Sequence, residues 1–376
     1  MTAREAYIVL NMIDGLGPVK VRALVDALGS PEAVLYAGHA DLLRAQGIGT
    51  ELAATILEQA PRLDPCEEEG KAQRHGGRII TFIDPDYPAP LKKIHDPPLC
   101  LYIQGTLEPV DKHALAIVGT RHATHYGLAM ADRLGYQMAR VGFTVVSGLA
   151  RGIDTAAHKG ALKAGGRTLA VLGSALDQLY PPENEDLAQE ISKKGAVISE
   201  YSMGRAPDRT TFPYRNRVVS GLAMGVVVVE AGVKSGALMT ADQALEQGRS
   251  VFAVPGRTDS SASKGPHQLI KNGARLVEDI DDIMQEFEFL IPDEKKKKAE
   301  SLDQRAEIPL TPDEQTVVRA LWEGPMDVDS LVRKTGLKVS QVSSLLMGME
   351  MKRVVHMLSG RMVELSRDLK LQGSGV

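Results

Sequence analysis

Cationic and aromatic side chains are concentrated in one short segment, residues 205–217. It contains four arginines, a single acid, and the aromatic residues Phe212 and Tyr214. Lys234 follows on the turn after the run GVVVVEA at 225–231, which is apolar up to Glu230. Guanidinium groups bind phosphate through paired hydrogen bonds, and aromatic rings stack on heterocyclic bases. The segment therefore predicts an anionic, heterocyclic ligand, and nucleic acid is our working hypothesis.

The overall composition limits this hypothesis to a local site. The chain has 376 residues and a net charge of −4, so no global positive charge attracts nucleic acid. Two cysteines, Cys66 and Cys100, exclude a disulfide framework and a zinc finger and fit a reducing cytoplasm. The apolar run near the N-terminus is too short to span a membrane. We expect a cytoplasmic protein with no membrane insertion and no metal site.

The first 75 residues are expected to be helical and contain one pattern twice. Gly15-Leu16-Gly17 and Gly47-Ile48-Gly49 each precede an amphipathic helix, an arrangement that resembles the helix-hairpin-helix motif. Backbone amides of such a turn, with the positive end of the following helix, can approach a phosphate. Flanking positive charge is sparse, so a helical packing module without DNA contact is the alternative interpretation.

Strands and helices alternate from residue 76 to about 290. The expected strands are Arg78–Ile83, Pro98–Gly105, Ala114–Thr120, Thr144–Gly148, Arg167–Ser174, Ala196–Tyr201, Gly225–Ala231, Ser250–Gly256 and Ala274–Glu278. Most are separated by segments long enough for a helix, as in 127–140 and 185–194. This alternation predicts an α/β domain with a Rossmann-like, doubly wound parallel sheet.

A charged segment and a small third domain are expected to follow. Residues 291–308 contain few apolar side chains, which is typical of a linker. In the domain at 309–376, Thr311 and Glu314 can form a capping box, and Asp327 can begin a second helix that Gly336 ends. A third helix and a hairpin complete the order of a winged helix. A dimerisation or protein-docking domain of the same fold is the alternative, and the whole chain would then act as an adaptor.

The ends of the expected strands supply groups that suit phosphate. Ligands of a doubly wound sheet bind at the carboxyl ends of its strands. Gly119-Thr120-Arg121 ends one strand and Ser147-Gly148 the next, so amides and a guanidinium meet at one edge. Neither G-x-G-x-x-G after the first parallel strand nor G-x-x-x-x-G-K-[ST] occurs, so no nucleotide cofactor is predicted.

A catalytic role for the same crevice is the rival hypothesis. Asp154 and His158 are four residues apart and share a helix face, so they could transfer protons in a nucleotide-metabolising enzyme. The simpler interpretation makes Asp154 the N-cap of the helix and His158 a packed or hydrogen-bonded residue. Glu200 and Glu230 end neighbouring strands, as catalytic acids or as partners of arginines, and Lys234 could pair with Glu230.

Six longer segments carry a combined signature that is more specific than any of these motifs. They are VGTRHATHYG (118–127), SGLARGIDTAAHKGAL (147–162), YPPEN (180–184), ISEYSMG (198–204), FPYRNRVVSGL (212–222) and VEAGVKSGALMTADQALEQGRSVFAVPG (229–256). Together they resemble the bacterial DNA-processing protein A family (DprA, also called Smf). The flanks resemble the sterile-alpha-motif-like and winged-helix domains of longer members.

The resemblance implies a protein that is not an enzyme and that binds single-stranded DNA taken up in natural transformation. Such proteins protect the strand, load the recombinase RecA onto it, and form homodimers through the Rossmann-like domain. The resemblance implies that Arg121, Arg209 and Phe212 bind the strand. We extend the predicted site to further residues of the strand ends and the basic segment: Gly119, Thr120, Ser147, Gly148, Arg215, Asn216, Arg217 and Lys234.

Two departures from the family pattern, at three positions, lie near the predicted site. Ser174-Ala175 stands where Cys-Gly is usual, and His267 stands where Asn is common. Both lie near the expected binding edge, so they bear on details of the pocket. Whether the host takes up DNA is left open.

Overall fold

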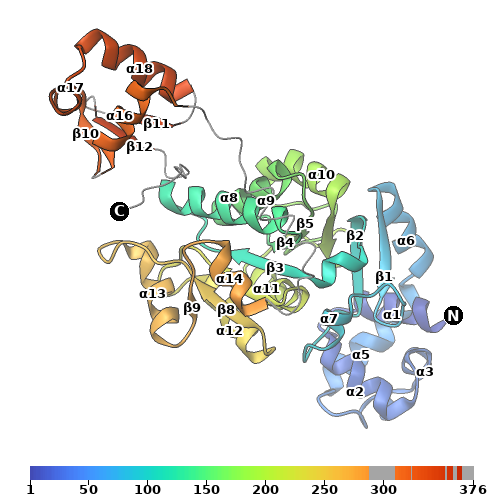
Figure 1. The fold of residues 1–376 in the computed structure, drawn as a ribbon. Coiled ribbons are helices and arrows are strands. Elements are labelled where there is room, and N and C mark those ends of the chain that lie inside the picture. Colours follow the sequence, from blue (N-terminus) through green and yellow to red (C-terminus); the bar gives the residue numbers. More distant parts are fainter. Residues whose placement is uncertain (288–309, 323, 352–353, 359–361, 366–376) are drawn as a thin grey trace. The chain divides into compact units, whose positions relative to one another are not determined.

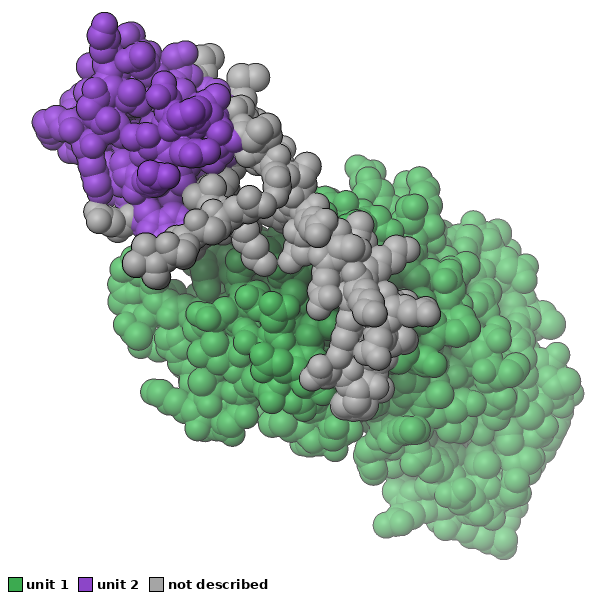
Figure 2. All heavy atoms as spheres, viewed as in Figure 1, with its two compact units in different colours: residues 1–299 green, residues 300–376 purple. Residues whose placement is uncertain are grey.

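The computed structural model describes residues 1–287, 310–322, 324–351, 354–358 and 362–365. The chain divides into two compact units, residues 1–299 and 300–376 (Figure 2). The predicted linker at 291–308 lies outside the described residues.

The N-terminal part of unit 1 is helical, as predicted. Its helices are α1 (Ala3–Met12), α2 (Pro18–Leu28), α3 (Pro31–Tyr36), α4 (His39–Leu42), α5 (Thr50–Gln59) and α6 (Pro65–Arg74) (Figure 1). Gly17 and Gly49 are the N-caps of α2 and α5, so each Gly-hydrophobic-Gly turn does open a helix. Leu10 and Leu24 belong to the same hydrophobic cluster as Tyr102 and Leu172 of the sheet domain. The helices and the sheet therefore share one core.

A nine-stranded sheet forms the centre of unit 1, in the order β1-β2-β6-β5-β4-β3-β7-β8-β9. The strands are β1 (Gly77–Thr81), β2 (Cys100–Gly105), β3 (Ala114–Val118), β4 (Thr144–Ser147), β5 (Thr168–Val171), β6 (Ala196–Ser199), β7 (Gly225–Val228), β8 (Ser250–Ala253) and β9 (Arg275–Leu276). The seven strands from β3 to β9 are parallel, which confirms the predicted sheet. β2 is antiparallel to both β1 and β6.

Helices cover both faces of the sheet, so the domain is doubly wound. Leu115 and Ile117 of β3 pack in a cluster with α8 (His125–Arg140) and α9 (Ile153–Lys163). Ala116 and Val118, which alternate with them, pack in a cluster with α11 (Thr211–Leu222) and α12 (Gly236–Glu246). Successive side chains of β3 thus pack on opposite faces of the sheet, as expected of a strand that is buried on both faces. The remaining helices of the domain are α7 (Ala89–Lys92), α10 (Glu185–Lys194), α13 (Lys264–Lys271) and α14 (Ile280–Phe287).

Unit 2 has the predicted winged-helix order. Its elements are α16 (Pro312–Leu321), β10 (Met326–Asp327), α17 (Val328–Thr335), α18 (Val339–Met351), β11 (Val355–Leu358) and β12 (Met362–Leu365). Thr311 and Glu314 form the expected capping box. Asp327 caps α17, and Gly336 ends it in the left-handed conformation. The strands pair in the order β10-β12-β11. Residues 359–361, between β11 and β12, lie outside the described residues.

In the part of the chain that the structure describes, no helix combines the length and the apolar character needed to cross a bilayer.

Candidate nucleic-acid interface

The carboxyl ends of β3, β4, β5 and β6 bring four segments of the chain together. Their residues line one small pocket: Arg121, Gly148, Ala150, Arg151, Tyr180, Pro181 and Phe212. Arg121, Gly148 and Phe212 were predicted from the sequence to share a site, and the structure does bring them together. Tyr180 and Arg151 were not among the predicted site residues. The sequence did contain a signal for them, because Arg151 stands in SGLARGID and Tyr180 in YPPEN, two motifs that carried the family resemblance.

Two arginines and two aromatic rings form a continuous row in this pocket. The guanidinium carbon of Arg121 lies 4.8 Å from the ring centroid of Phe212. The rings of Phe212 and Tyr180 are 5.8 Å apart, tilted by 55°. The guanidinium carbon of Arg151 lies 5.6 Å from the ring of Tyr180. Each arginine is therefore within cation–π distance of an aromatic ring. We call these four residues the cation–ring row.

Two glycines of the strand ends are required by the close approach of side chains. A Cβ atom on Gly173 would lie 2.6 Å from Cδ1 of Phe212. A Cβ atom on Gly148 would lie 2.4 Å from Nη1 of Arg215. Both distances are far below van der Waals contact. Steric need thus explains these glycines, in addition to the exposure of backbone amides that the sequence suggested.

Several groups predicted to face a phosphate have protein partners. The hydroxyl of Ser147 is fully buried and donates to the backbone oxygen of Ile117 at 2.6 Å. The amide of Gly148 donates to Oδ2 of Asp154 at 3.1 Å. The amide of Thr120 donates to the backbone oxygen of Glu230 at 2.7 Å. This geometry assigns all three groups first to holding the turns, and their contact with DNA stays a prediction, as does that of Gly119.

Asp154 and His158 do not face the pocket. Asp154 is not the N-cap of α9, as the simpler interpretation had it: Gly152 is, and Asp154 binds the amides of the preceding loop. Burial raises the pKa of Asp154 to about 6, against the opposing effect of Arg215. His158 is fully buried, and its Nδ1 lies 2.6 Å from Oγ1 of Thr168. Burial lowers the pKa of His158 to about 3, so it is neutral at physiological pH. The histidine is a hydrogen-bonded core residue.

Two arginines of the basic segment are buried behind the pocket. Arg215 donates to the backbone oxygens of Gly148, at 2.8 Å, which directly follows β4, and of Val171, the last residue of β5. Arg217 forms ion pairs with Glu200 and, at 2.9 Å, with Asp96. The sequence predicted direct DNA contact for both arginines. Their geometry instead places them beneath the binding surface, where they join strand ends, and DNA contact by them stays untested.

Arg209, Lys234 and Asn216 differ in their environment. Arg209 and Lys234 are exposed. Asn216 is half-buried, and its Nδ2 donates to the backbone oxygen of Gly236 at 3.2 Å.

Glu230 accepts hydrogen bonds from the amide and the hydroxyl of Thr124, at 2.9 and 2.6 Å. The carboxylate of Glu230 is thus bound at the start of α8, and the pairing with Lys234 that the sequence allowed is not formed.

The positions that depart from the family pattern are accommodated without entering the pocket lining. The amide of Ala175 donates to the backbone oxygen of Arg205 at 2.9 Å. The backbone oxygen of Ser174 accepts from Ser199 at 2.7 Å. Nε2 of His267 lies 3.0 Å from the backbone oxygen of Gly256. These contacts connect loops of the edge to each other.

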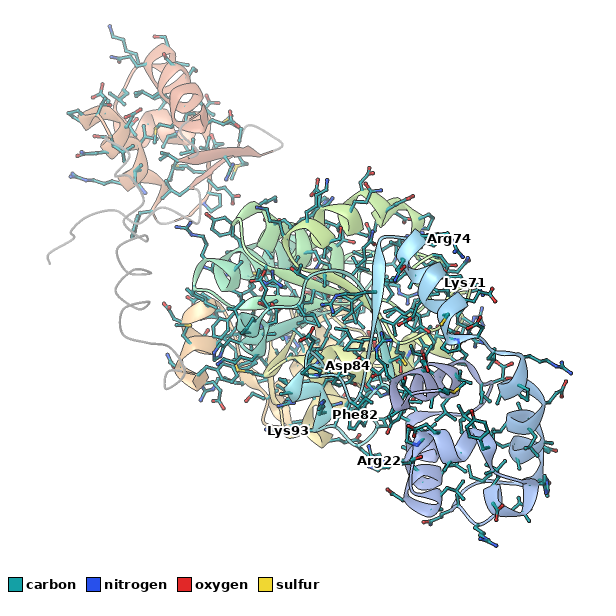
Figure 3. All side chains as sticks on the ribbon, turned by 90° about the vertical axis from the view of Figure 1, so that its right-hand side faces the viewer. Arg22, Lys71, Arg74, Phe82, Asp84 and Lys93 are labelled. Atoms are coloured by element: carbon teal, nitrogen blue, oxygen red, sulfur yellow. The ribbon has the colours of Figure 1, made fainter. Side chains whose placement is uncertain are left out.

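A second, larger cavity lies between the N-terminal helices and the start of the sheet. Its volume is about 240 Å³, and it is lined mainly by apolar residues: Tyr7, Pro18, Val21, Arg22, Val25, Asp26, Phe82, Pro97 and Leu99. Figure 3 shows Arg22 and Phe82 from this lining, with Lys93 at the end of α7. Its two charged residues, Arg22 and Asp26, have opposite signs. The cavity is therefore less suited to a phosphate backbone than the pocket at the strand ends.

Comparison with known proteins identifies the family. A model of the DNA recombination-mediator protein A family matches residues 78–288, more than half of the chain and all of the strand-end pocket. The chain belongs to this family. The DprA winged helix domain matches residues 301–361, and a SAM-like helix-hairpin-helix tandem matches residues 7–61. The family and the three-part fold expected from the sequence are both confirmed.

Several relatives resemble this DprA family member over much of its length. Protein Smf of Synechocystis is 33% identical, covering 94% of this chain and 96% of that protein. The DNA processing protein DprA of Streptococcus pneumoniae is 42% identical, covering 64% and 84%. The X-ray structure of Streptococcus pneumoniae DprA matches with a TM-score of 0.67 and 34% identity, covering 76% of this chain and 98% of that one. A Helicobacter pylori DprA structure, reported for its single-stranded DNA binding mode, matches with a TM-score of 0.52 and 29% identity, covering 58% and 99%.

Proposed function

We propose that this protein binds single-stranded DNA at the carboxyl edge of its sheet and acts in the processing of DNA during transformation. One observation carries the proposal: Arg121 and Phe212, which are 91 positions apart in the sequence, meet at 4.8 Å in one pocket. A cation beside an aromatic ring suits a ligand made of alternating phosphates and bases. The single-stranded DNA binding mode reported for the Helicobacter pylori relative supports the same ligand.

Each proposed contact has a chemical role. The ring of Phe212 stacks on a base, and Arg121, Arg209 and Lys234 neutralise phosphates. The described residues that line the pocket include no carboxylate, imidazole or thiol. Among the described residues there is also no group of three or more His, Cys, Asp or Glu side chains placed to hold a metal ion. These features favour a site that holds a strand over one that cleaves it.

The proposal extends to the partners that the family resemblance implies. We infer that the protein protects the bound strand in the cytoplasm, delivers it to the recombinase RecA, and works as a homodimer through the Rossmann-like domain. β9 supports the dimer, because it is the last strand of the sheet and both its residues, Arg275 and Leu276, are exposed. An exposed edge strand offers unpaired backbone groups to a second chain.

Replacement of two of the proposed phosphate-binding cations, Arg121 and Arg209, tests the DNA-binding proposal. Binding of a fluorescent single-stranded oligonucleotide is measured by anisotropy over a range of salt concentrations. Three phosphate contacts give a log–log salt slope of about −2, from about −0.7 for each contact. The double variant Arg121→Ala/Arg209→Ala should bind more weakly, with a slope of about −0.7.

The control variant is Lys193→Ala/Lys194→Ala, which removes the same charge at the end of α10, just before β6 begins. It should leave affinity and slope unchanged. Equal affinity of wild type and the Arg121→Ala/Arg209→Ala variant would contradict the proposed site. A duplex of the same length, measured in parallel, shows whether the single strand is preferred.

A further inference from the structure

The cation–ring row fills the pocket in the free protein. The cavity volume left there is only about 10 Å³, no more than a single water molecule needs. A base therefore cannot reach the face of Phe212 until a neighbour of that ring moves. The neighbours are Arg121 and Tyr180. The row has to open when a strand binds.

An acidic residue occupies the far end of the row. Both carboxylate oxygens of Glu183 bind the guanidinium group of Arg151, one through Nε and the other through Nη2 at 3.0 Å. Nη1 of Arg151 also lies 3.3 Å from the hydroxyl of Tyr180. A carboxylate and a phosphate both match the paired donors of a guanidinium group. Glu183 thus presents to Arg151 the same hydrogen-bonding pattern that a DNA phosphate would.

The ion pair is not needed to hold the loop that carries Arg151. Nδ2 of Asn184, which is buried, donates to the backbone oxygen of Leu149 and to Oγ1 of Thr155, both at 2.8 Å. These bonds fix both sides of the loop, including Leu149, whose φ of 56° needs such support. The side chains of Arg151 and Glu183 are 46% and 49% exposed. Their pair is available for exchange.

We propose that Tyr180 and Arg151 form a second nucleotide subsite beside Phe212, whose phosphate position Glu183 occupies in the free protein. The inference rests on the proposed binding of single-stranded DNA and adds to it a second base and a competing internal anion. On binding, a strand phosphate replaces the carboxylate of Glu183 on Arg151. The ring of Tyr180 then stacks on the base next to the one on Phe212.

Replacing the carboxylate of Glu183 by a strand phosphate costs little free energy because the ion pair is at the surface. Exposed ion pairs contribute little to stability, so competition by Glu183 lowers the affinity for DNA by about five-fold at most. Stacking of one base on an aromatic ring is a larger effect, and its loss weakens binding by about ten-fold or more. The subsite therefore raises the affinity for DNA, and competition by Glu183 removes only part of this gain.

The test compares variants of the full chain by fluorescence anisotropy with single-stranded oligothymidylates of increasing length. Tyr180→Leu should weaken binding of the longer oligomers by about ten-fold, whereas Tyr180→Phe should bind like wild type because it keeps the ring. Glu183→Gln should tighten binding by up to about five-fold. Its matched control, Glu190→Gln, removes an exposed charge from α10 and should have no effect.

A double-mutant cycle keeps the proposal falsifiable even if Tyr180→Leu does not fold. Arg151→Gln replaces an exposed side chain and should weaken binding. In that background Glu183→Gln should no longer tighten binding, because the carboxylate has no cation to compete for. Tightening that persists without Arg151 would overturn the internal competition.

The outcomes separate this inference from the proposed function. If Tyr180→Leu, Arg151→Gln and Glu183→Gln all bind like wild type while Arg121→Ala/Arg209→Ala binds weakly, the second subsite is overturned and the main site stands. If wild type binds no oligomer of the series, both are overturned. Loss of affinity in Tyr180→Leu and Arg151→Gln, with tightening only when Arg151 is present, supports the second subsite.

Discussion

Two layers of polar residues lie at the same edge of the sheet, and they use the same residue types differently. The outer layer contains the cation–ring row, whose two arginines are exposed and lie beside aromatic rings, and the exposed Arg209. The inner layer contains Arg215, Arg217 and their partners, and is buried. Arg209 and Arg217 are only eight positions apart in the sequence. An arginine in the outer layer is available to a ligand, whereas one in the inner layer is committed to the fold.

The physical difference between the layers is the cost of removing charge from water. A buried guanidinium group is tolerated only with close partners. Arg217 has Glu200 and Asp96, and Arg215 has the carbonyl groups that end β4 and β5. Substitutions in the inner layer should therefore change stability, and those in the outer layer should change affinity.

The largest effect is expected for Arg217→Ala. The variant leaves Glu200 buried without its counter-charge, which should lower the free energy of unfolding of unit 1 by about 3–5 kcal/mol. Urea unfolding followed by far-UV circular dichroism measures it, since the only tryptophan, Trp322, belongs to unit 2. Arg209→Ala is the control from the outer layer and should change stability by no more than about 0.5 kcal/mol. Equal stability of the two variants would remove the distinction between the layers.

Acid should destabilise the fold through the buried His158, whose ring is hydrogen-bonded to Thr168 at the start of β5. Its pKa is about 3 in the folded protein because it is buried, and about 6.5 in the unfolded chain. Between these values the unfolded state binds the additional proton, so stability falls as the pH drops below 6.5, by about 2 kcal/mol at pH 5. Burial raises the pKa of Asp154 to about 6, so Asp154 titrates in the same range with the opposite sign: its stabilising contribution is present at low pH and is lost as pH rises towards 6.

His158→Gln isolates the effect of the histidine, because the contribution of Asp154 is common to both proteins. Between pH 7 and pH 5, wild type should lose about 2 kcal/mol more stability than the variant. Chemical unfolding at the two pH values measures this difference. Parallel pH profiles of wild type and His158→Gln would show that the histidine does not titrate as a buried group.

Gly173→Ala links the two layers, because it alters the wall behind Phe212. The new methyl group would lie 2.6 Å from Cδ1 of Phe212, so the ring must shift. We expect binding of single-stranded DNA to weaken by about ten-fold, as part of the stacking on Phe212 is lost, with a stability loss of about 1 kcal/mol. Gly232→Ala, on a turn of the same edge with open space around it, is the matched control. Full affinity of Gly173→Ala would mean that Phe212 does not need its present position.

The smallest effect is expected for Lys234→Ala. Lys234 is exposed and is proposed to contact one phosphate, so its loss should weaken binding by about two- to five-fold and reduce the salt slope by about 0.7. Lys159→Ala, on α9, removes another exposed lysine for comparison. Anisotropy titrations at several salt concentrations measure both quantities. An unchanged slope would place Lys234 outside the strand's path.

Most of the fold could be predicted from local sequence patterns. Short apolar runs such as 225–228 alternate with amphipathic segments such as 185–194, and both became the elements expected. The helix caps could also be predicted, because each bonds a backbone amide within three residues of itself. Thr311 and Glu314 form one such cap, and Asp327 forms another. The antiparallel pairing of β2 with β6 could not be predicted from local patterns, since it joins residues almost a hundred positions apart.

The sequence predicted where the site lies, but not all of its residues or which of them are buried. Arg121 and Phe212 were assigned to the site through the family resemblance, and Gly148 because strand ends of a parallel sheet meet at one edge; all three line one pocket. Tyr180 was missed, although it stands in the motif YPPEN, because residue type and local spacing do not show that its ring lies beside Phe212. The burial of Arg215 and Arg217 was missed because their partners, including Val171 and Asp96, lie far away in sequence.

By itself, the sequence determined the α/β architecture, the family, and the gathering of cations and aromatic residues at the strand ends. These properties follow from residue type and short-range spacing, which act over one turn of a helix or one strand. Only the tertiary structure decided which arginines face solvent, which ring lies beside which cation, and that Glu183 holds Arg151. Burial and partner choice depend on side chains brought together by the sheet, so an arginine at position 209 and one at 217 have the same chemistry until the fold places one in water and the other in the core.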